Sequence, residues 1–577
     1  MQTIQFYPEH EFCPDCFSKL KVQKTRTKTV ITMDIGAFRA KETILECPQD
    51  QRVFTSEQLR ALAPEKGTFG FDVIVYVGKA LLVHCGNVYE IIKDLAAKNI
   101  SISEREISAL GRKFVVYLAL AHRQSRKQLR HVMMKKGGYI LHVDGTCEGD
   151  SPHLFTGLDA ISEFVLHNIK IASEKKDLIV PFFCHVKQQY GTPIALVHDM
   201  GKAILAAIAT VFPNTPDFIC HFHFLRDIGK DLFEEQYRII LNRLKKYGIR
   251  TALRQKLKAL EEKLGEDSQI FHDLIVSIEK GQIETLSLQQ IPAVSTCVLI
   301  HWAFESSKQS DGYGFPFDYP HLVFYQRLKV IHSTMKIIMD IHLRNKIKDN
   351  RPFYQLWRLL DEVINDKKLK QAAALMEEKT AVFNKLRQAL RIALPDGKDG
   401  LNDDGEDTNI KTIERSMKTF WDYLINDPNL LTKDYYQKML AQIDQYWDKL
   451  FADPITVITP DGPITIVPQR TNNILERFFR SLKRKFRKRS GTLSLSKTLK
   501  TILADTPLVK NLDNDEYLQI ILNGNETLEE RFAQIDSKLV VEQLKLAQES
   551  AKCISSEMKK LIKRQNLPQQ ISALFVA

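Results

Sequence analysis

Three acidic residues have the side-chain type and the setting that a site for divalent metal ions requires. Asp144 and Asp199 each follow a short apolar run, and Glu476 lies far downstream as the only acid in a strongly basic stretch, 471–489. Two metal ions about 4 Å apart, held by carboxylates, acidify a nucleophile, stabilise the charge on a leaving oxygen and keep the two in line. Mg²⁺ and Mn²⁺ are hard cations that prefer oxygen ligands. The three acids therefore predict metal-dependent cleavage of phosphodiester bonds, with all three as catalytic residues and metal ligands.

Each acid also has a simpler interpretation. An Asp after a buried strand is often a turn residue or a helix cap. Glu476 could be the ion-pair partner of Arg477 or Arg480 on its own helix. The joint placement of the three acids favours the metal site.

The elements around Asp144 and Asp199 follow from the apolar and helical patterns of 137–235. A meander of three strands comes first, and helices then alternate with strands. The expected strands are 139–143, 154–158, 164–171, 193–198 and 217–220, with helices near 177–190, 200–211 and 222–235. This order is typical of a ribonuclease H-like α/β core with a mixed five-stranded sheet, in which the first and fourth strands are neighbours. Asp144 and Asp199 should then lie close together, in the first part of the core.

The final helix of the core is expected within 466–499. Apolar residues recur every four positions from Ile474 to Phe486, which predicts a buried stripe, while Glu476 shares another face with basic residues. The basic run could be a solvated face, but so many like charges favour contact with phosphate groups. The expected DNA-binding residues of this helix are Arg477, Arg480, Lys483, Arg484, Lys485, Arg487, Lys488 and Arg489.

The N-terminal segment 1–65 resembles a small zinc ribbon. Cys13-Pro-Asp-Cys16 precedes two alternating segments, and Cys47-Pro follows them. A fourth Cys is missing, so two interpretations stay open. Either Asp50 or His10 completes a tetrahedral zinc site with the three cysteines, since zinc accepts carboxylate and imidazole as well as thiolate, or the fold has lost its metal.

Segment 66–136 is expected to be helical. A helix around 88–95 is followed by a break and a second helix at 104–121, where Ser103 and Glu106 have the spacing of a capping box. The pair fits a helix-turn-helix whose second helix reads a major groove, or an ordinary helical hairpin.

Segment 236–465 is expected to be a large all-α insertion that ends in a β-hairpin around Thr-Pro-Asp-Gly-Pro, which returns the chain to the core. Within it, Trp302 and the aromatic run 313–319 either pack in the core or stack on an unpaired base. The acidic stretch 395–408 is expected to be exposed and mobile. Segment 500–577 is expected to be a helical tail without chemistry of its own.

Composition limits the class of protein. The chain of 577 residues is long enough for several domains, and its net charge of +12 gathers in local clusters, which favours a polyanionic partner. No apolar stretch reaches the roughly 20 residues that span a bilayer, so no membrane partner is expected. Nine scattered cysteines fit free thiols in a reducing compartment. We expect a cytoplasmic, nucleoid-associated protein.

One further motif joins the second and third acids. Cys220 ends a strand and His223 begins the next helix, so the two are expected to approach each other and brace the sheet near Asp199. A zinc site is the weaker interpretation, because a second pair of ligands is missing. With this motif the chain resembles the Mutator-like transposases and their bacterial insertion-sequence relatives. The resemblance is close over 137–235 and 466–490, and it rests on Asp144-Gly-Thr, Val197-His-Asp199, Cys220-x-x-His223 and Thr471-Asn-Asn-x-x-Glu476.

The resemblance implies a DDE-type transposase. In such an enzyme Asp144, Asp199 and Glu476 bind two Mg²⁺ or Mn²⁺ ions, cleave double-stranded DNA at transposon ends and direct the freed 3′ hydroxyl at target DNA. A homodimer or a larger synaptic assembly is implied as well. Two rivals remain: a transposon-derived DNA-binding regulator that no longer cuts, and a structure-selective nuclease that cleaves without joining.

Overall fold

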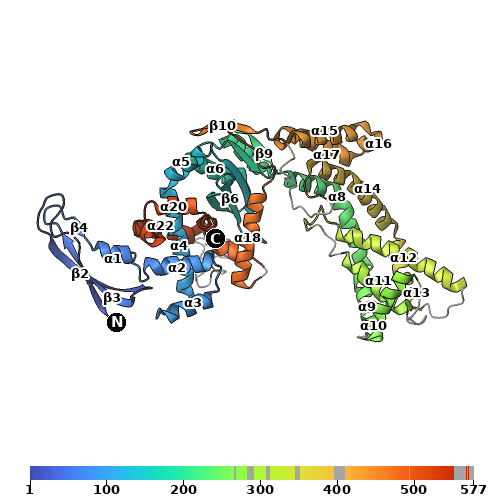
Figure 1. The fold of residues 1–577 in the computed structure, drawn as a ribbon, viewed down its shortest axis with the longest axis horizontal. Coiled ribbons are helices and arrows are strands. Elements are labelled where there is room, and N and C mark those ends of the chain that lie inside the picture. Colours follow the sequence, from blue (N-terminus) through green and yellow to red (C-terminus); the bar gives the residue numbers. More distant parts are fainter. Residues whose placement is uncertain are drawn as a thin grey trace. The chain divides into compact units, whose positions relative to one another are not determined.

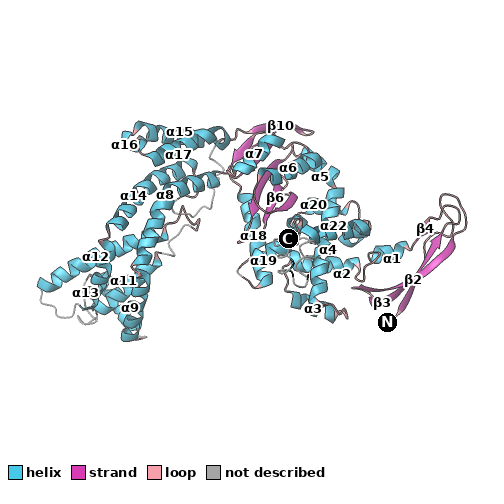
Figure 2. Cartoon of the chain, turned by 180° about the vertical axis from the view of Figure 1, so that it is seen from behind, coloured by secondary structure: helices cyan, strands magenta, loops and turns pink. Residues whose placement is uncertain are grey.

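The computed structural model describes residues 1–265, 268–281, 291–306, 312–344, 351–394, 410–492 and 494–550, with 564, 567 and 570 beyond them. The chain divides into two compact units. Unit 1 comprises 1–218 and 454–577, and unit 2 comprises 219–453 (Figures 1 and 2). The acidic stretch 395–408 lies outside the described residues.

Unit 1 begins with a small sheet made of β1 (Thr3–Phe6), β2 (Lys21–Thr32), β3 (Gly36–Glu46) and β4 (Val53–Phe54), followed by α1 (Glu57–Leu62). The strand order is β1-β3-β2, and β4 pairs with β3. Alternate residues of β3 are buried, as the alternating sequence predicts, because one face packs against Leu59 of α1. On that face Glu42 is buried and accepts a hydrogen bond of 2.7 Å from Nε of Arg26.

Four helices follow: α2 (Phe71–Leu82), α3 (Val88–Ala97), α4 (Glu104–Gln124) and α5 (Arg126–Lys135). The predicted capping box is confirmed, since Ser103 and Glu106 bond each other's backbone N–H groups. Every residue from Phe114 to His122 is buried, so α4 is a central core helix. Its N-terminal half includes exposed residues such as Arg105 and Arg112, so groove reading by α4 stays a prediction.

The larger sheet of unit 1 contains β5 (Ile140–Thr146), β6 (His153–Asp159), β7 (Val165–Ile171), β8 (Ala195–His198) and β9 (Asp217–Ile219), in the order β7-β6-β5-β8-β9. β5, β6 and β7 form an antiparallel meander, and β5 and β8 are parallel. Helices α6 (Lys176–Tyr190) and α7 (Lys202–Val211) connect the later strands. The predicted strands and the helices 177–190 and 200–211 are confirmed within a few residues, and so is the neighbouring position of the first and fourth strands. The third predicted helix, 222–235, runs on to Lys246.

The chain returns to unit 1 through the hairpin of β10 (Ile455–Thr459) and β11 (Gly462–Ile466). Ile455 and Ile466 pack against Ile140 and Val197 on the larger sheet, so the prediction that the hairpin leads back to the core is confirmed. Helix α18 (Asn473–Ser490) comes next. Its predicted stripe is confirmed, because Ile474, Phe478 and Phe486 are buried and Leu482 is partly buried.

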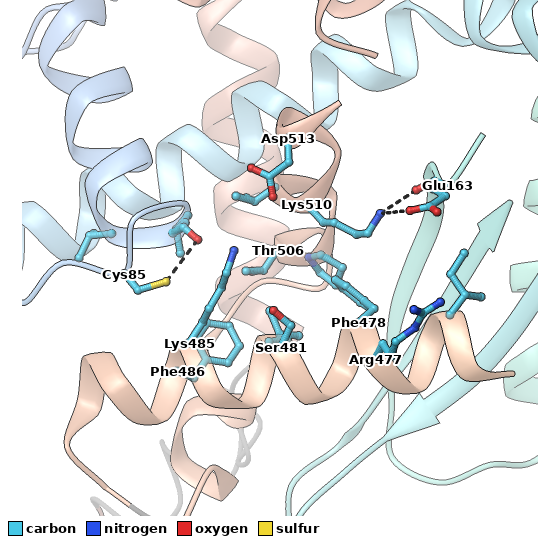
Figure 3. Close-up of a pocket in the computed structure, with 16 residues that line it drawn as sticks. Cys85, Glu163, Arg477, Phe478, Ser481, Lys485, Phe486, Thr506, Lys510 and Asp513 are labelled. Atoms are coloured by element: carbon cyan, nitrogen blue, oxygen red, sulfur yellow. Dashed lines mark hydrogen bonds and ion pairs between the residues drawn. The ribbon is translucent and has the colours of Figure 1, made fainter. Parts of the chain in front are cut away.

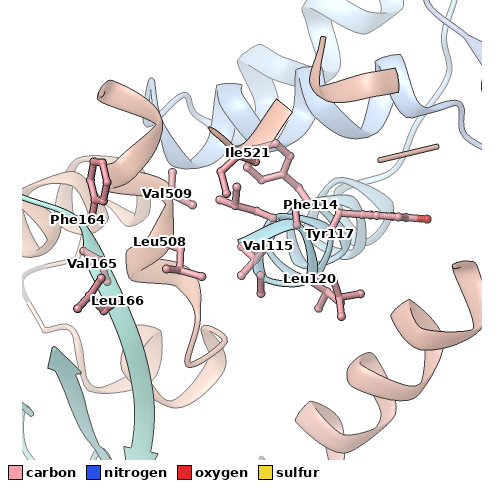
Figure 4. Packing of buried hydrophobic residues seen from close by; sticks show 14 of the residues in the cluster. Phe114, Val115, Tyr117, Leu120, Phe164, Val165, Leu166, Leu508, Val509 and Ile521 are labelled. Atoms are coloured by element: carbon pink, nitrogen blue, oxygen red, sulfur yellow. The ribbon is translucent and has the colours of Figure 1, made fainter. Parts of the chain in front are cut away.

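The C-terminal segment is part of the core. It contains α19 (Ser496–Thr501), the 3₁₀ helix η1 (Thr506–Asp513), α20 (Asp515–Leu522), α21 (Leu528–Ala533) and α22 (Ser537–Ser550). Leu508, Val509 and Ile521 join Phe114 and Val165 in one apolar cluster (Figure 4). The side chain of Asn511 bonds both the N–H and the C=O of Val165, at 2.8 and 2.9 Å. These bonds satisfy two backbone groups of β7. The C-terminal segment is therefore part of the core of unit 1, and not only the helical tail that its sequence predicts.

Unit 2 is mainly helical in its described residues and begins with Ile219, the last residue of β9. Its helices are α8 (His221–Lys246), α9 (Ile249–Leu264), α10 (Ser268–Lys280), α11 (Ile291–Glu305), α12 (Pro320–Arg344), α13 (Arg351–Ile364), α14 (Lys367–Leu390), α15 (Ile410–Asn426), α16 (Pro428–Leu431) and α17 (Asp434–Leu450). Unit 2 spans 219–453, whereas the sequence pattern predicts an insertion over 236–465. Helix α8 runs without a break from His221 to Lys246, across the first predicted boundary. That unit 2 is an insertion in a ribonuclease H-like core stays a prediction.

Among the described residues, every helix is too short or too polar to cross a bilayer.

A buried histidine makes unit 1 sensitive to acid. His122 lies in the core, with Nδ1 2.8 Å from the Tyr517 hydroxyl and Nε2 2.7 Å from the Tyr190 hydroxyl. Burial lowers the pKa of His122 from 6.5 to about 4, and burial also lowers the pKa of His167 well below its ordinary value. The folded chain thus resists a proton that the unfolded chain accepts below about pH 6.5.

We expect the free energy of unfolding of unit 1 to fall by about 2 kcal/mol between about pH 7 and about pH 5, because His122 binds a proton more readily in the unfolded chain. Above about pH 7 the contribution of His122 to this free energy should not change with pH. All four tryptophans lie in unit 2, so fluorescence would report the wrong part of the chain. Hydrogen exchange of β6 and β7 measures the change instead. His122→Gln should be less stable at pH 7 but should show a shallower pH dependence; an unchanged slope would refute the assignment.

Candidate functional site

The register of the larger sheet brings the first two acids together. β5 and β8 are parallel, with His142 opposite Val197. β8 ends at His198, so Asp199 directly follows it, while Asp144 lies two residues after His142 on β5. The two acids therefore lie at the same end of neighbouring parallel strands.

Three other acids lie near enough to Asp144 for their charges to act on it; this group of four is called the acidic cluster. Burial raises the pKa of Asp144 well above its ordinary value, and the negative charges of Asp199, Glu476 and Glu174 raise it further. A single hydrogen bond opposes them, in which Gly145 N–H donates to Asp144 Oδ1 at 2.7 Å. Added positive charge would relieve the repulsion among these carboxylates.

Asn472 anchors the helix that carries Glu476, and the sequence analysis missed it. Its side-chain amide donates to the Val143 carbonyl at 2.8 Å, and its carbonyl oxygen lies 3.0 Å from Nδ1 of His142. Asn472 is fully buried, and its backbone carbonyl accepts the N–H of Glu476 at 3.0 Å. The start of α18 is thereby attached to β5 next to Asp144. The Thr-Asn-Asn sequence before the helix was the available signal.

The orientation of Asn472 also determines the state of His142. Because the amide nitrogen of Asn472 faces a carbonyl, its oxygen faces His142 and accepts the Nδ1 proton. Burial lowers the pKa of His142 to about 4, so the ring is neutral near neutral pH. A neutral ring adds no charge beside the acids.

Glu174 is a fourth acid near the site that sequence reasoning did not single out. It lies between β7 and α6, and its Oε1 is 3.0 Å from Nδ1 of His153. A Cβ atom on Gly145 would lie 2.5 Å from the same oxygen, so a larger residue there would make the Glu174 side chain move.

A row of polar side chains continues across the sheet from the acids. Thr156 pairs with Asp144, and Asn168 pairs with Thr156. Both are buried, and the side-chain oxygen of Thr156 and both polar atoms of Asn168 lack a hydrogen-bond partner. Buried polar atoms of this kind usually bind ordered water. A row of buried polar side chains therefore extends from Asp144 across β6 and β7, at positions where buried residues are usually apolar.

His198 holds the backbone at the second acid. Its Nδ1 lies 2.6 Å from the Asp199 carbonyl oxygen, and its Nε2 lies 3.2 Å from the Asp217 carboxylate on β9. The Asp199 side chain itself accepts the N–H of Gly201 at 3.0 Å. These bonds determine the direction in which the chain leaves β8.

Cys220 and His223 lie in unit 2, at the start of α8. Cys220 is the N-cap residue, His223 is in the first turn, and both side chains are buried with their ligand atoms within 4.8 Å of each other. The predicted approach of the two residues is confirmed. Their role in bracing the sheet stays a prediction.

The basic residues of α18 differ in exposure. Arg477, Arg480, Arg484, Arg487 and Lys488 are exposed, whereas Lys483, Lys485 and Arg489 are partly buried. The guanidinium of Arg489 lies 5.2 Å above the Phe486 ring, and burial lowers its pKa. The exposed group is therefore the better candidate for a phosphate contact.

A pocket of about 320 Å³ lies along another side of α18 (Figure 3). Arg477, Lys485 and Lys510 line it together with apolar residues such as Phe478, and Lys510 pairs with Glu163 at 3.6 Å. None of the three predicted catalytic acids belongs to its lining. The pocket is thus separate from the acidic cluster.

Trp302 is on α11 in unit 2 and is 39% exposed. The Arg327 guanidinium lies 4.7 Å above its ring, so one ring face is already covered. In the aromatic run, Phe317 stacks on Phe222 of α8 and Phe315 stacks on Tyr237. Core packing thus accounts for these two phenylalanines, and base stacking by Trp302 stays a prediction.

The three N-terminal cysteines lie together. The Sγ atoms of Cys13, Cys16 and Cys47 are within 4.8 Å of one another, and all three thiols are free of disulfides. A cluster of this kind is compatible with zinc.

Comparison of the chain with models of known protein families gives no match, and comparison with characterised proteins gives none either.

The repulsion at the acidic cluster can be measured. We expect Asp144→Asn to raise the stability of unit 1 by on the order of 1 kcal/mol in the presence of a chelator, because it removes a charge held among three other acids. Asp159→Asn is the matched control. Asp159 is also buried, but its carboxylate accepts hydrogen bonds from Ile140, Ile161 and Ser162, so its replacement should destabilise. Hydrogen exchange of β5 and β6 measures the change in stability in both variants. If Asp144→Asn destabilised unit 1, the proposed repulsion among the acids would be wrong.

Proposed function

We propose that the chain is a DDE-type DNA transposase with a ribonuclease H-like core. Asp144, Asp199 and Glu476 are its catalytic residues, and the helical unit 2 is an insertion between the second and third acids. The order β7-β6-β5-β8-β9, with a meander followed by a parallel strand, supports the core assignment.

One observation carries the proposal: three acids distant in sequence are electrostatically coupled in space. Asp144 lies on β5 and Asp199 directly follows the neighbouring parallel strand β8, and the charges of Asp199 and Glu476 both act on Asp144. An Asp that only caps a turn, or a Glu that only pairs with an arginine, does not need other carboxylates close to it. Joint placement is what cleavage with two metal ions requires.

The donor set suits Mg²⁺ or Mn²⁺. The carboxylates of Asp144, Asp199 and Glu476 would hold two such ions, which acidify the attacking hydroxyl and stabilise the leaving oxygen. The protein's own contribution is to keep the acids in place. Asn472 and His198 do so through backbone contacts on β5 and at Asp199, and the neutral His142 adds no competing charge.

The exposed face of α18 supports a DNA substrate. Arg477, Arg480, Arg484, Arg487 and Lys488 follow Glu476 on the same helix, so they are placed to contact phosphates on either side of a cleaved bond. Binding of both ends and target DNA in a homodimer or a larger synaptic assembly is part of the proposal.

Cleavage and joining of labelled DNA test the proposal. Purified protein is incubated with Mg²⁺ or Mn²⁺, a labelled fragment carrying the ends of its own element, and a target plasmid. We expect nicks at the ends and joined products, both lost by more than about a thousandfold in Asp199→Asn and Glu476→Gln, because each removes a ligand charge. The control is Asp177→Asn, an exposed acid three residues after Glu174, which should cleave as the natural chain does.

Each other outcome has a distinct meaning. Binding without cleavage in every variant would favour a regulator. Cleavage without joined products would favour a nuclease. Cleavage that survives Asp199→Asn would show that the acidic cluster is not the active site.

The anchoring role of Asn472 gives a separate prediction. Asn472→Ala should lower the rate of cleavage by about ten- to a hundredfold, because Glu476 loses its fixed position beside β5, while DNA affinity stays unchanged. Asn473→Ala, one residue later and only half-buried, is the matched control. Raising the Mn²⁺ concentration should partly restore Asn472→Ala but not Glu476→Gln. Equal rates in the two asparagine variants would disprove the role.

A further inference from the structure

Two turns of the N-terminal sheet have the same sequence pattern. Cys13-Pro-Asp-Cys16 precedes β2, and Cys47-Pro-Gln-Asp50 follows β3. Cys and Pro occupy the first two positions of both turns. The fourth position is Cys16 in one turn and Asp50 in the other.

The backbones of the two turns also match. In the first, Phe17 N–H donates to the Cys13 carbonyl at 2.9 Å, and in the second Gln51 N–H donates to the Cys47 carbonyl at 3.0 Å. Phe17 and Gln51 both adopt the left-handed conformation, with φ of 57° and 59°, although neither is glycine. The N–H groups of Cys13 and Cys47 each donate to the backbone carbonyl of the residue five positions later, at 2.9 and 2.8 Å. Asp50 therefore occupies the position in its turn that Cys16 occupies in the other.

The side chains of the two turns converge. The Sγ atoms of Cys16 and Cys47 are 3.4 Å apart, and Cys13 Sγ lies 3.8 Å from Asp50 Oδ2. A disulfide would bring two sulfurs to about 2.05 Å. Ligands around a tetrahedral zinc ion, with Zn–S near 2.3 Å and Zn–O near 2.0 Å, lie roughly 3.5–3.8 Å from one another. These two separations, and the three sulfurs within 4.8 Å of one another, are closer to the second arrangement.

We propose that Cys13, Cys16, Cys47 and Asp50 together bind one zinc ion, with Asp50 in the place of a fourth thiolate. The other candidates are engaged elsewhere. The Asp15 carboxylate pairs with the Arg52 guanidinium. The ring of His10 is exposed and packs edge-on against Phe54.

The second oxygen of Asp50 is already held. Arg52 N–H donates to Asp50 Oδ1 at 2.9 Å, which leaves Oδ2 directed at the cysteines. The carboxylate would thus bind through one oxygen, as a tetrahedral site requires. A hydrogen bond from the backbone to a ligand atom also fixes the ligand's direction before the ion arrives.

The role of the ion follows from where the turns lie. The first turn leads into β2 and the second leads out of β3, so the site joins the open ends of the long hairpin. The apolar cluster of this sheet has few members, chiefly Phe6, Val30, Phe38 and Leu59. A sheet with so small a core gains much of its stability from a bound metal.

Metal content and cobalt spectra of the full chain test this site without reference to catalysis. The natural chain should contain one zinc ion that Cys16→Ser lacks, and Co²⁺ in its place should give the strong sulfur-to-cobalt absorption of a tetrahedral thiolate site. Asp50→Asn should weaken zinc binding, measured in competition with a chelator, by about tenfold or more. Asp15→Asn, an acid in the same cluster, is the matched control and should leave the affinity unchanged.

Asp50→Cys guards against a variant that simply fails to fold. A fourth thiolate should raise the sulfur-to-cobalt absorption by about a third and tighten zinc binding. Zinc retained by Cys16→Ser, natural affinity in Asp50→Asn, or an unchanged cobalt spectrum in Asp50→Cys would each overturn the proposal.

Discussion

Carboxylates that repel one another can stay close only if the surrounding chain holds them there. Burial and the charges of Asp199, Glu476 and Glu174 all oppose ionisation of Asp144, and unit 1 has to supply the rigidity that keeps them together. It does so through the paired strands β5 and β8 and through Asn472, which fastens α18 to β5. The rest of unit 1 serves this arrangement, because a sheet that slipped by one residue would turn Asp144 to the other face.

The C-terminal segment contributes to that rigidity from the far edge of the sheet. Asn511 bonds both backbone groups of Val165, and Tyr517 reaches His122 in the core. The edge strand β7 and the central strand β5 are held in the same way: a buried asparagine from a late segment bonds the backbone of an early strand. A bond of this kind is strong because a buried backbone group without a partner is costly. Folding of the larger sheet therefore depends on residues more than 300 positions downstream.

Two kinds of metal chemistry can coexist in unit 1 because their ligands differ in hardness. Asp144, Asp199 and Glu476 offer carboxylate oxygens, which suit Mg²⁺ or Mn²⁺, whereas the N-terminal turns offer three thiolates and one carboxylate, which suit zinc. Soft thiolates also discriminate against magnesium. Under the two proposals each site would thus select its own ion, one for cleavage and the other for stability.

Local patterns in the sequence were enough to predict the secondary structure around the acids. The apolar runs before Asp144 and Asp199, the four-residue repeat from Ile474 and the Ser103–Glu106 capping box all depend on neighbours within a few residues, and the structure confirms them. The partners of Asn472, the approach of Glu174 over Gly145, the burial of α4 and the incorporation of the C-terminal segment could not be found in that way. They join residues that are distant in sequence, and one chain has no local periodicity that records which distant segment fills a given space. The sequences of the two turns are similar, but similarity alone does not show that Asp50 and Cys16 occupy equivalent positions. The backbone shows it, because both turns have the same hydrogen bonds and the same left-handed residue.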